Sequence, residues 1–188
     1  ALVIGSEQII SALFGYGSFD ETSVYNSSLA LYYFALGLPA FAFIKVFSSF
    51  FFANHDTQTP FYISLISVIL NISISLYYFN EIGFIIIPIA TSISSWLNSI
   101  LLFLFLKNKN LFFFNEIFFV NLVKIIIASI LMGLFFSYLL IFFQNELEFN
   151  RAIKSLYLIL SVILSLLFYL FICHFINAFK MSDIKLKY

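Results

Sequence analysis

Charged residues are scarce in this 188-residue sequence, because nine Lys and Arg and nine Asp and Glu make up only 10% of it. A soluble domain carries about 25% charged residues, whereas 63% of this chain is hydrophobic and its mean hydropathy is +1.07. No soluble fold of this size buries that much apolar surface, so the composition indicates an integral membrane protein. The net charge of zero argues against a nucleic-acid partner.

Residues that carry catalytic or metal chemistry are also rare. The single cysteine, Cys173, excludes an internal disulfide framework. The sequence has no HExxH motif, no paired cysteines, no glycine-rich phosphate loop and no acidic cluster of the magnesium–pyrophosphate type. Cys173 and His174 fit packing and interfacial roles at the end of the last apolar run. We therefore expect no enzyme activity, no catalytic residues and no metal centre.

Long apolar runs make up most of the chain. A helix needs about 20 apolar residues to cross the hydrocarbon core of a membrane, and five runs have this length, preceded by a partial run at residues 1–14. The five full runs lie at residues 29–53, 61–79, 83–106, 117–143 and 153–178. The sequence therefore predicts an all-α, polytopic transmembrane helix bundle with about five full spans plus one partial span.

The lysines predict the orientation of these spans, since cytoplasmic connectors are enriched in Lys and Arg. The connector at 107–110 carries two lysines, and the tail carries Lys180, Lys185 and Lys187. Two spans separate the connector from the tail, so both are expected in the cytoplasm, together with the connector at 54–60. The chain begins in an apolar run without a basic n-region, which favours a C-terminal part of a longer protein over a signal peptide.

The segment at residues 37–60, GLPAFAFIKVFSSFFFANHDTQTP, interrupts the apolar pattern. Helix breakers and lysine at membrane depth are costly unless they face protein or a water-filled cavity. Lys45 either extends its ammonium group to the cytoplasmic surface or faces the interior of the bundle. Asp56 is the nearest acidic residue in the sequence that could pair with it.

Two pairs of polar residues share helix faces within the apolar runs. Asn71 and Ser75 are four residues apart, and Thr91 and Ser95 repeat this spacing beside Pro88, which predicts a kink. Such side chains usually bond to their own backbone or to a neighbouring helix. A kinked helix also frees carbonyls, so the same residues offer oxygen ligands for Na⁺. Both interpretations are carried forward, although no carboxylate lies within these two runs away from their ends.

Three segments resemble a known family: LFGYGSF at 13–19, LGLPAFAFIKV at 36–46 and FFANHDTQTP at 51–60. They are similar to the MurJ (MviN) lipid II flippase family, within the superfamily of multidrug, oligosaccharidyl-lipid and polysaccharide exporters. The resemblance implies the C-terminal lobe of a fourteen-helix flippase, whose N-terminal lobe would be a partner. Residues 1–110 would then hold the end of helix nine to helix twelve, and residues 111–188 the extra C-terminal helix pair and a cytoplasmic tail.

The resemblance also implies a function. The expected cargo is lipid II, an undecaprenyl-pyrophosphate-linked peptidoglycan precursor, moved from the inner to the outer leaflet of the bacterial inner membrane by alternating access. Lys45 would line the substrate cavity. Asp56, Thr59 and Pro60 would shape a cytoplasmic gate. A polysaccharide or multidrug exporter of the same superfamily, or a non-transporting membrane scaffold subunit, is the alternative; the scaffold predicts that Lys45, Asn71 and Thr91 tolerate apolar replacement.

The resemblance further implies ligand and lipid contacts. By position, the Na⁺ ligands would be Asn71, Ser75, the Ile87 carbonyl and Thr91, with Ser75 in place of a family carboxylate. His55 stands near a position where the family often has arginine, which argues against a fixed cytoplasmic salt bridge and leaves a pH-sensitive one through His55. Besides contacts with membrane lipids, a groove for the undecaprenyl tail is expected on the last helix pair. Its residues would be Phe135, Phe136, Leu139, Leu160, Leu164 and Leu167.

Overall fold

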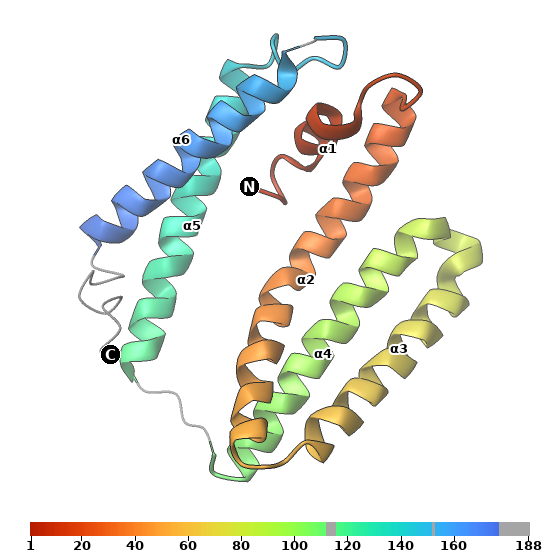
Figure 1. Ribbon diagram of the computed structural model, residues 1–188, viewed down its shortest axis with the longest axis vertical. Helices are drawn as coiled ribbons and strands as arrows, with labels where there is room; N and C mark the ends of the chain where they lie inside the picture. The colour runs from red at the N-terminus through yellow and green to blue at the C-terminus, as the bar shows by residue number, and fades with distance from the viewer. Residues whose placement is uncertain (112–115, 152, 177–188) are drawn as a thin grey trace. The chain divides into compact units, whose positions relative to one another are not determined.

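The computed structural model describes residues 1–111, 116–151 and 153–176, and these form α-helices without any strand (Figure 1). The helices are α1 (Ser6–Phe14), α2 (Glu21–Ala53), α3 (Gln58–Ile82), α4 (Ile86–Asn108), α5 (Glu116–Phe142) and α6 (Lys154–Phe175), with a 3-10 turn at Gly83–Ile85. The predicted all-α class is confirmed. The tail lysines Lys180, Lys185 and Lys187 lie outside the described residues.

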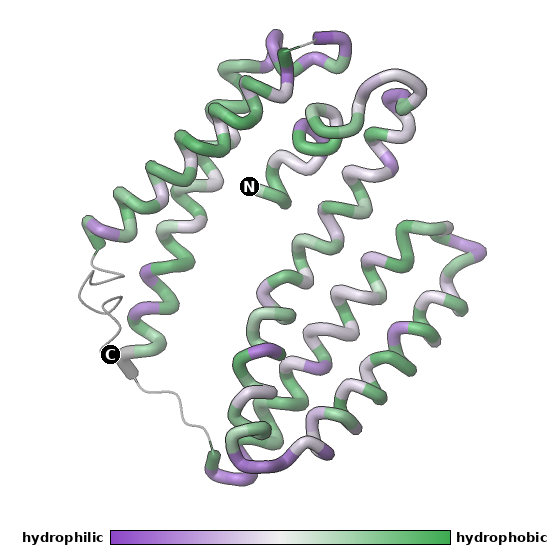
Figure 2. The backbone as a smooth tube through the Cα atoms, in the orientation of Figure 1, coloured by the Kyte–Doolittle hydropathy of each residue, from purple (hydrophilic) through white to green (hydrophobic). Residues whose placement is uncertain are grey.

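Four helical segments of the described chain are long and apolar enough to cross a membrane. They are Glu21–Ala53, Gln58–Asn108, Phe118–Phe142 and Lys154–Phe175. The 51-residue segment Gln58–Asn108 contains two helices, α3 and α4, which fold back on each other at Gly83, where φ is 73° (Figure 1). Figure 2 shows that hydrophobic residues dominate the helices and that hydrophilic residues gather at the connectors. The predicted polytopic bundle is confirmed.

The chain divides into two compact units, which are described separately. The first unit comprises Ala1–Val24 and Phe114–Tyr188, and the second comprises Tyr25–Phe113. One boundary lies close to the division predicted at residue 110. The grouping of the first 24 residues with the C-terminal helix pair had no signal in the sequence. The assignment of these helices to positions nine to fourteen of a larger protein stays a prediction.

In the first unit, α1, α5 and α6 pack around two hydrophobic clusters. Phe136 is fully buried in the larger cluster, together with Ala12, Leu140, Leu147 and Leu158. The smaller cluster contains Ala128, Ile172 and Cys173, of which Cys173 is 1% exposed. The packing role predicted for Cys173 is therefore confirmed, and His174 beside it is exposed.

Helix α2 begins eight residues before the apolar run predicted at 29–53. Asp20 causes this early start, because its side chain accepts hydrogen bonds of 2.8 Å from the Ser23 backbone amide and the Thr22 hydroxyl. An aspartate in this position satisfies amides that the first helical turn leaves unpaired. These hydrogen bonds also lower the pKa of Asp20. Hydropathy therefore located the apolar part of α2 and missed its polar first turns.

The kink predicted at Pro88 is wrong. Helix α4 begins at Ile86, so Pro88 lies in its first turn, where a missing N–H leaves no hydrogen bond unmade. The proline within a helix is instead Pro39 in α2. Near it, the Trp96 indole donates a 3.0 Å hydrogen bond from α4 to the Leu36 carbonyl. The backbone around Pro39 thus gains a hydrogen bond from a neighbouring helix.

A close crossing of α2 and α4 explains the glycine that precedes this proline. A Cβ atom on Gly37 would lie 2.8 Å from Ser92 Oγ and 3.2 Å from Ser92 Cα. The Ser92 hydroxyl also donates a hydrogen bond to the Tyr33 carbonyl of α2. Small residues at membrane helix interfaces allow backbones to approach in this way. The GLP sequence therefore serves the contact between α2 and α4.

Candidate functional site

Asp56 links three helix ends in the second unit. Its carboxylate accepts hydrogen bonds from the Thr59 backbone amide at 3.0 Å and from the Thr59 hydroxyl at 2.7 Å, at the start of α3. It also forms an ion pair of 2.5 Å with Lys109, the residue that follows α4. The D-x-x-T-P sequence after α2 is thereby joined to the end of α4. We call Asp56, Thr59 and Lys109 the connector lock.

The environment of the connector lock favours the charged form of Asp56. The hydrogen bonds from Lys109 and Thr59 hold the pKa of Asp56 far below its ordinary value. The Lys109 ammonium also lies 5.7 Å from the centre of the Phe51 ring, which is fully buried. Pro60 is buried at the first turn of α3. The three residues predicted to shape a gate, Asp56, Thr59 and Pro60, therefore all lie at the start of α3.

Two predictions about this connector are corrected. Asp56 pairs with Lys109 and not with Lys45, since the chain places Asp56 beside the end of α4. A salt bridge therefore exists although the arginine typical of the family is missing. His55 takes no part in it and adopts a positive φ of 58° in the turn. The ion pair also confirms that the connectors at 54–60 and 107–110 lie at the same end of the hairpin.

Lys45 is exposed on α2. It lies four residues after Phe41 and next to Ile44, and both of these residues line a groove against α3 and α4. Residues four apart share a helix face, so Lys45 lies beside the groove. Its assignment to the substrate cavity stays a prediction.

The four residues predicted as cation ligands lie together as a hydrogen-bonded chain. Ser75 donates to the Asn71 amide oxygen at 3.5 Å, and the Asn71 amide nitrogen donates to Thr91 Oγ1 at 3.1 Å. Thr91 in turn donates to the Ile87 carbonyl at 2.8 Å. The Asn71 nitrogen also bonds to Ser94 Oγ at 3.2 Å. The Asn71 amide nitrogen, and not its oxygen, faces Thr91. The arrangement therefore fits hydrogen bonding between α3 and α4, and the oxygens of these four residues do not point to one common ion position.

A groove beside these hydrogen-bonded side chains extends to Asn98, which the sequence analysis did not single out. It has a volume of about 240 Å³ and is lined by residues of α2, α3 and α4, including Ser64, Ser67 and Asn98. Asn98 is 8% exposed, and its amide nitrogen approaches Ser64 Oγ at 3.5 Å. The spacing of Thr91, Ser95 and Asn98, at four and seven residues, is the helical pattern that could have revealed it.

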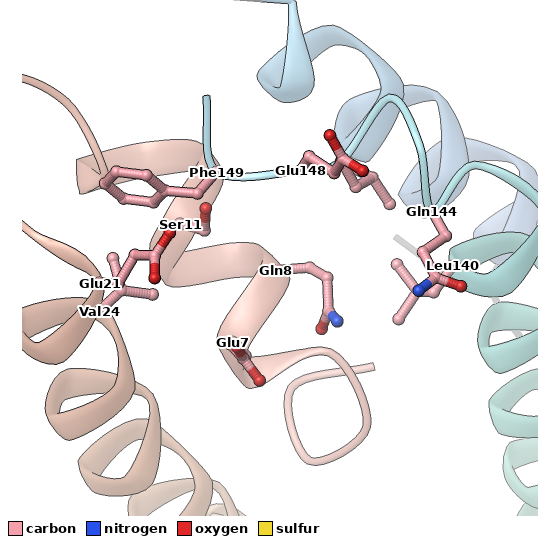
Figure 3. A pocket seen from close by; sticks show the side chains of 10 residues that line it. Glu7, Gln8, Ser11, Glu21, Val24, Leu140, Gln144, Glu148 and Phe149 are labelled. Atoms are coloured by element: carbon pink, nitrogen blue, oxygen red, sulfur yellow. The ribbon is translucent and has the colours of Figure 1, made fainter. Parts of the chain in front are cut away.

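A second cavity lies within the first unit. It measures about 340 Å³ and is lined by acidic residues of three segments, Glu7, Glu21 and Glu148, and by apolar side chains (Figure 3). Close to it, Lys154 is fully buried at the start of α6. Its ammonium group donates to the carbonyls of Gly15 and Phe149 at 2.7 Å each and lies 4.4 Å from the centre of the Tyr16 ring. No pattern in the sequence indicated that this lysine is buried.

The six residues predicted for a lipid-tail groove do not share one surface. Phe136 and Leu139 are buried, at 0% and 6% exposure, and Phe135 stacks on Phe168 with a centroid distance of 4.3 Å. On α6, by contrast, the predicted residues are exposed. They are Leu160, Leu164 and Leu167. The pattern of Phe and Leu located apolar surface and could not separate helix packing from lipid contact.

Comparison with known proteins places this chain in a family. The family model described as "Lipid II flippase MurJ" matches residues 1–159. A Rhizobium meliloti protein named "Probable lipid II flippase MurJ" is 42% identical over 105 residues, which cover 55% of this chain and 19% of that protein. Proteins of the same name from Rickettsia prowazekii and Haemophilus influenzae are 37% and 30% identical over 102 and 131 residues.

These two matches cover 54% and 69% of this chain. They cover 20% and 25% of the respective relatives, so the chain spans about a fifth to a quarter of the length of the curated relatives it matches. The family match itself extends over most of the chain, from the partial first run into α6. The resemblance first noted in three segments therefore holds over the second unit and most of the first, and this chain belongs to the MurJ lipid II flippase family.

Proposed function

We propose that this chain forms part of a lipid II flippase of the bacterial inner membrane, with no enzymatic activity of its own. The family match over residues 1–159 carries the proposal, and relatives named for lipid II flipping support it. The cargo would be the undecaprenyl-pyrophosphate-linked precursor, moved outward by alternating access between this chain and an N-terminal lobe. The orientation that we propose has the connector lock and the C-terminus in the cytoplasm.

Within this mechanism the chain's residues have separate tasks. The connector lock would fix the cytoplasmic ends of α2, α3 and α4, so that the three helices move together when the cavity opens and closes. Lys45 would supply a positive charge next to the groove, where an anionic headgroup can meet it. Na⁺ as the coupling ion stays a prediction, and no step of the mechanism is assigned to it.

Complementation tests this proposal. The complete protein should restore growth to a bacterium whose own lipid II flippase is depleted, and Lys45→Ala should abolish the rescue if this charge faces the cavity. Lys107→Ala, which removes an exposed lysine at the end of α4, is the matched control and should leave rescue intact. A well-expressed parent that fails to rescue would favour a polysaccharide or multidrug exporter. A scaffold would likewise fail to rescue and, unlike a transporter, would tolerate apolar residues at 45, 71 and 91. Rescue by such variants would contradict the roles proposed for these residues.

A further inference from the structure

Asn98 carries a buried polar atom without a partner near the middle of a membrane span. Its Oδ1 is a buried side-chain oxygen that accepts no hydrogen bond from the described residues. Asn98 lies 12 residues after the first residue of α4, about 18 Å along a helix of about 34 Å. In hydrocarbon, an oxygen left in this state is destabilising, since neither lipid nor apolar side chains can donate to it.

The hydroxyl groups around Asn98 make no hydrogen bond to its Oδ1. Ser64 Oγ lies 3.5 Å from the amide nitrogen of Asn98 instead. Ser67, Ser94 and Ser95, which line the same groove, each donate to a carbonyl of their own helix three or four residues earlier, at 2.9 to 3.1 Å. Each of these hydroxyl protons is therefore already used in a hydrogen bond, whereas each hydroxyl oxygen can still accept one. Asn98 Oδ1 and these serine oxygens are therefore hydrogen-bond acceptors, and a bound molecule with hydrogen-bond donors would satisfy them.

The groove can hold such a molecule. Its volume of about 240 Å³ far exceeds the roughly 15 Å³ of cavity that one water molecule requires. Phe41 and Ile44 of α2 form its apolar side. The lining contains no carboxylate or other charged side chain, so no negative charge in it offsets the loss of hydration that a cation would suffer.

We propose that water occupies this groove and donates a hydrogen bond to Asn98 Oδ1, with the oxygens of Ser67 and Ser95 as further acceptors. Water has two donors for a lining that offers acceptors, and buried waters typically make about three hydrogen bonds. The groove is then a hydrated part of the protein interior, and the face of the α3–α4 hairpin that carries it lies away from lipid. This assignment is independent of the cargo.

Cysteine accessibility tests the proposal in the complete protein in membranes. Cys173→Ala removes the single cysteine of this chain, with any cysteine outside it also replaced, and single cysteines are then placed by Asn98→Cys and by the near-isosteric Ser67→Cys. A small water-soluble methanethiosulfonate reacts with thiolate, which forms in water and not in hydrocarbon. Ile100→Cys is the matched control, because Ile100 is 51% exposed on α4 and shares an exposed apolar stripe with Ile93 and Leu104.

We expect both groove cysteines to be modified about tenfold faster than the control, or more. Equal rates for Asn98→Cys, Ser67→Cys and Ile100→Cys would overturn the proposal; since Ser67→Cys changes one atom, misfolding of Asn98→Cys alone cannot hide this result. The rates should also be the same in Na⁺ and K⁺ buffers. Strong protection by Na⁺ alone would assign the groove to a cation and overturn the assignment to water. Neither readout depends on lipid II transport, so this inference and the proposed function fail separately.

Discussion

Lys154 donates a 2.7 Å hydrogen bond to the carbonyl oxygen of Gly15, a residue 139 positions earlier in the chain. This bond joins the start of α6 to the turn between α1 and α2. The lysine is fully buried, and a Cβ on Gly15 would lie 3.1 Å from its Nζ. A buried ammonium is stable only where acceptors surround it, so the carbonyls and aromatic rings of two connectors define its position.

We expect Lys154→Met to destabilise the first unit. The substitution keeps the length of the apolar stem but leaves the carbonyls of Gly15 and Phe149 without their donor, at a cost of about 1–3 kcal/mol for each buried group. Thermal unfolding of the protein in detergent measures the change. Lys107→Met, at an exposed lysine, is the control and should unfold like the parent. Equal melting temperatures for the two variants would contradict the structural role of Lys154.

The connector lock predicts a defined pH dependence. Because the pKa of Asp56 is lowered in the folded protein, its stabilising effect is complete above the ordinary carboxyl pKa of about 3.9 and is lost as the pH falls through the folded value. The stability difference between the parent and Asp56→Asn should therefore be constant from about pH 5 to 8 and shrink below about pH 4. Unfolding curves at each pH measure it.

A step in that difference between about pH 6 and 7, where histidines ordinarily titrate, would contradict this prediction. It would instead support the pH-sensitive link through His55. Lys109→Gln should give the same flat profile as Asp56→Asn over the neutral range, since either substitution removes the ion pair.

The close contact of α2 and α4 makes Gly37 sensitive to substitution. Gly37→Ala places a methyl group 3.2 Å from Ser92 Cα, and a backbone atom cannot move aside without shifting a helix, so we expect destabilisation of about 1–3 kcal/mol. Gly133→Ala is the matched control, because its new methyl group would meet only the end of the Ile4 side chain, at 2.8 Å. Thermal unfolding in detergent should rank Gly37→Ala well below Gly133→Ala; the reverse order would argue against the close crossing.

Asn71 distinguishes hydrogen bonding from ion binding. Asn71→Leu removes the bonds to Thr91 and Ser94, and membrane measurements suggest a loss of about 0.6 kcal/mol for an average interhelical hydrogen bond. If these bonds only join the two helices, the loss should be equal in Na⁺ and K⁺ buffers. A melting temperature that rises with Na⁺ in the parent and not in Asn71→Leu would favour the cation interpretation.

The sequence was sufficient for the apolar parts of the helices and for the connectors between them, because apolar runs and polar breaks report directly on membrane depth. Spacing placed Asn71 and Ser75 on one helix face, and the resemblance added Ile87 and Thr91; the structure joins the four by hydrogen bonds. The sequence was insufficient where contacts join distant segments. The ion pair of Asp56 with Lys109 depends on how α4 returns beside the end of α2, and the burial of Lys154 depends on a turn far away in the chain. No local pattern encodes either contact.

Helices of the second unit are in contact at two depths. One contact is the connector lock at the helix ends, and the other is that of Gly37 with Ser92 within the apolar part of α2 and α4. A single contact would allow α2 and α4 to rotate about it, whereas two contacts at different depths oppose that rotation. We therefore expect α2 and α4 to move as one body, so that a displacement of either helix at the groove also moves the connector at 54–60.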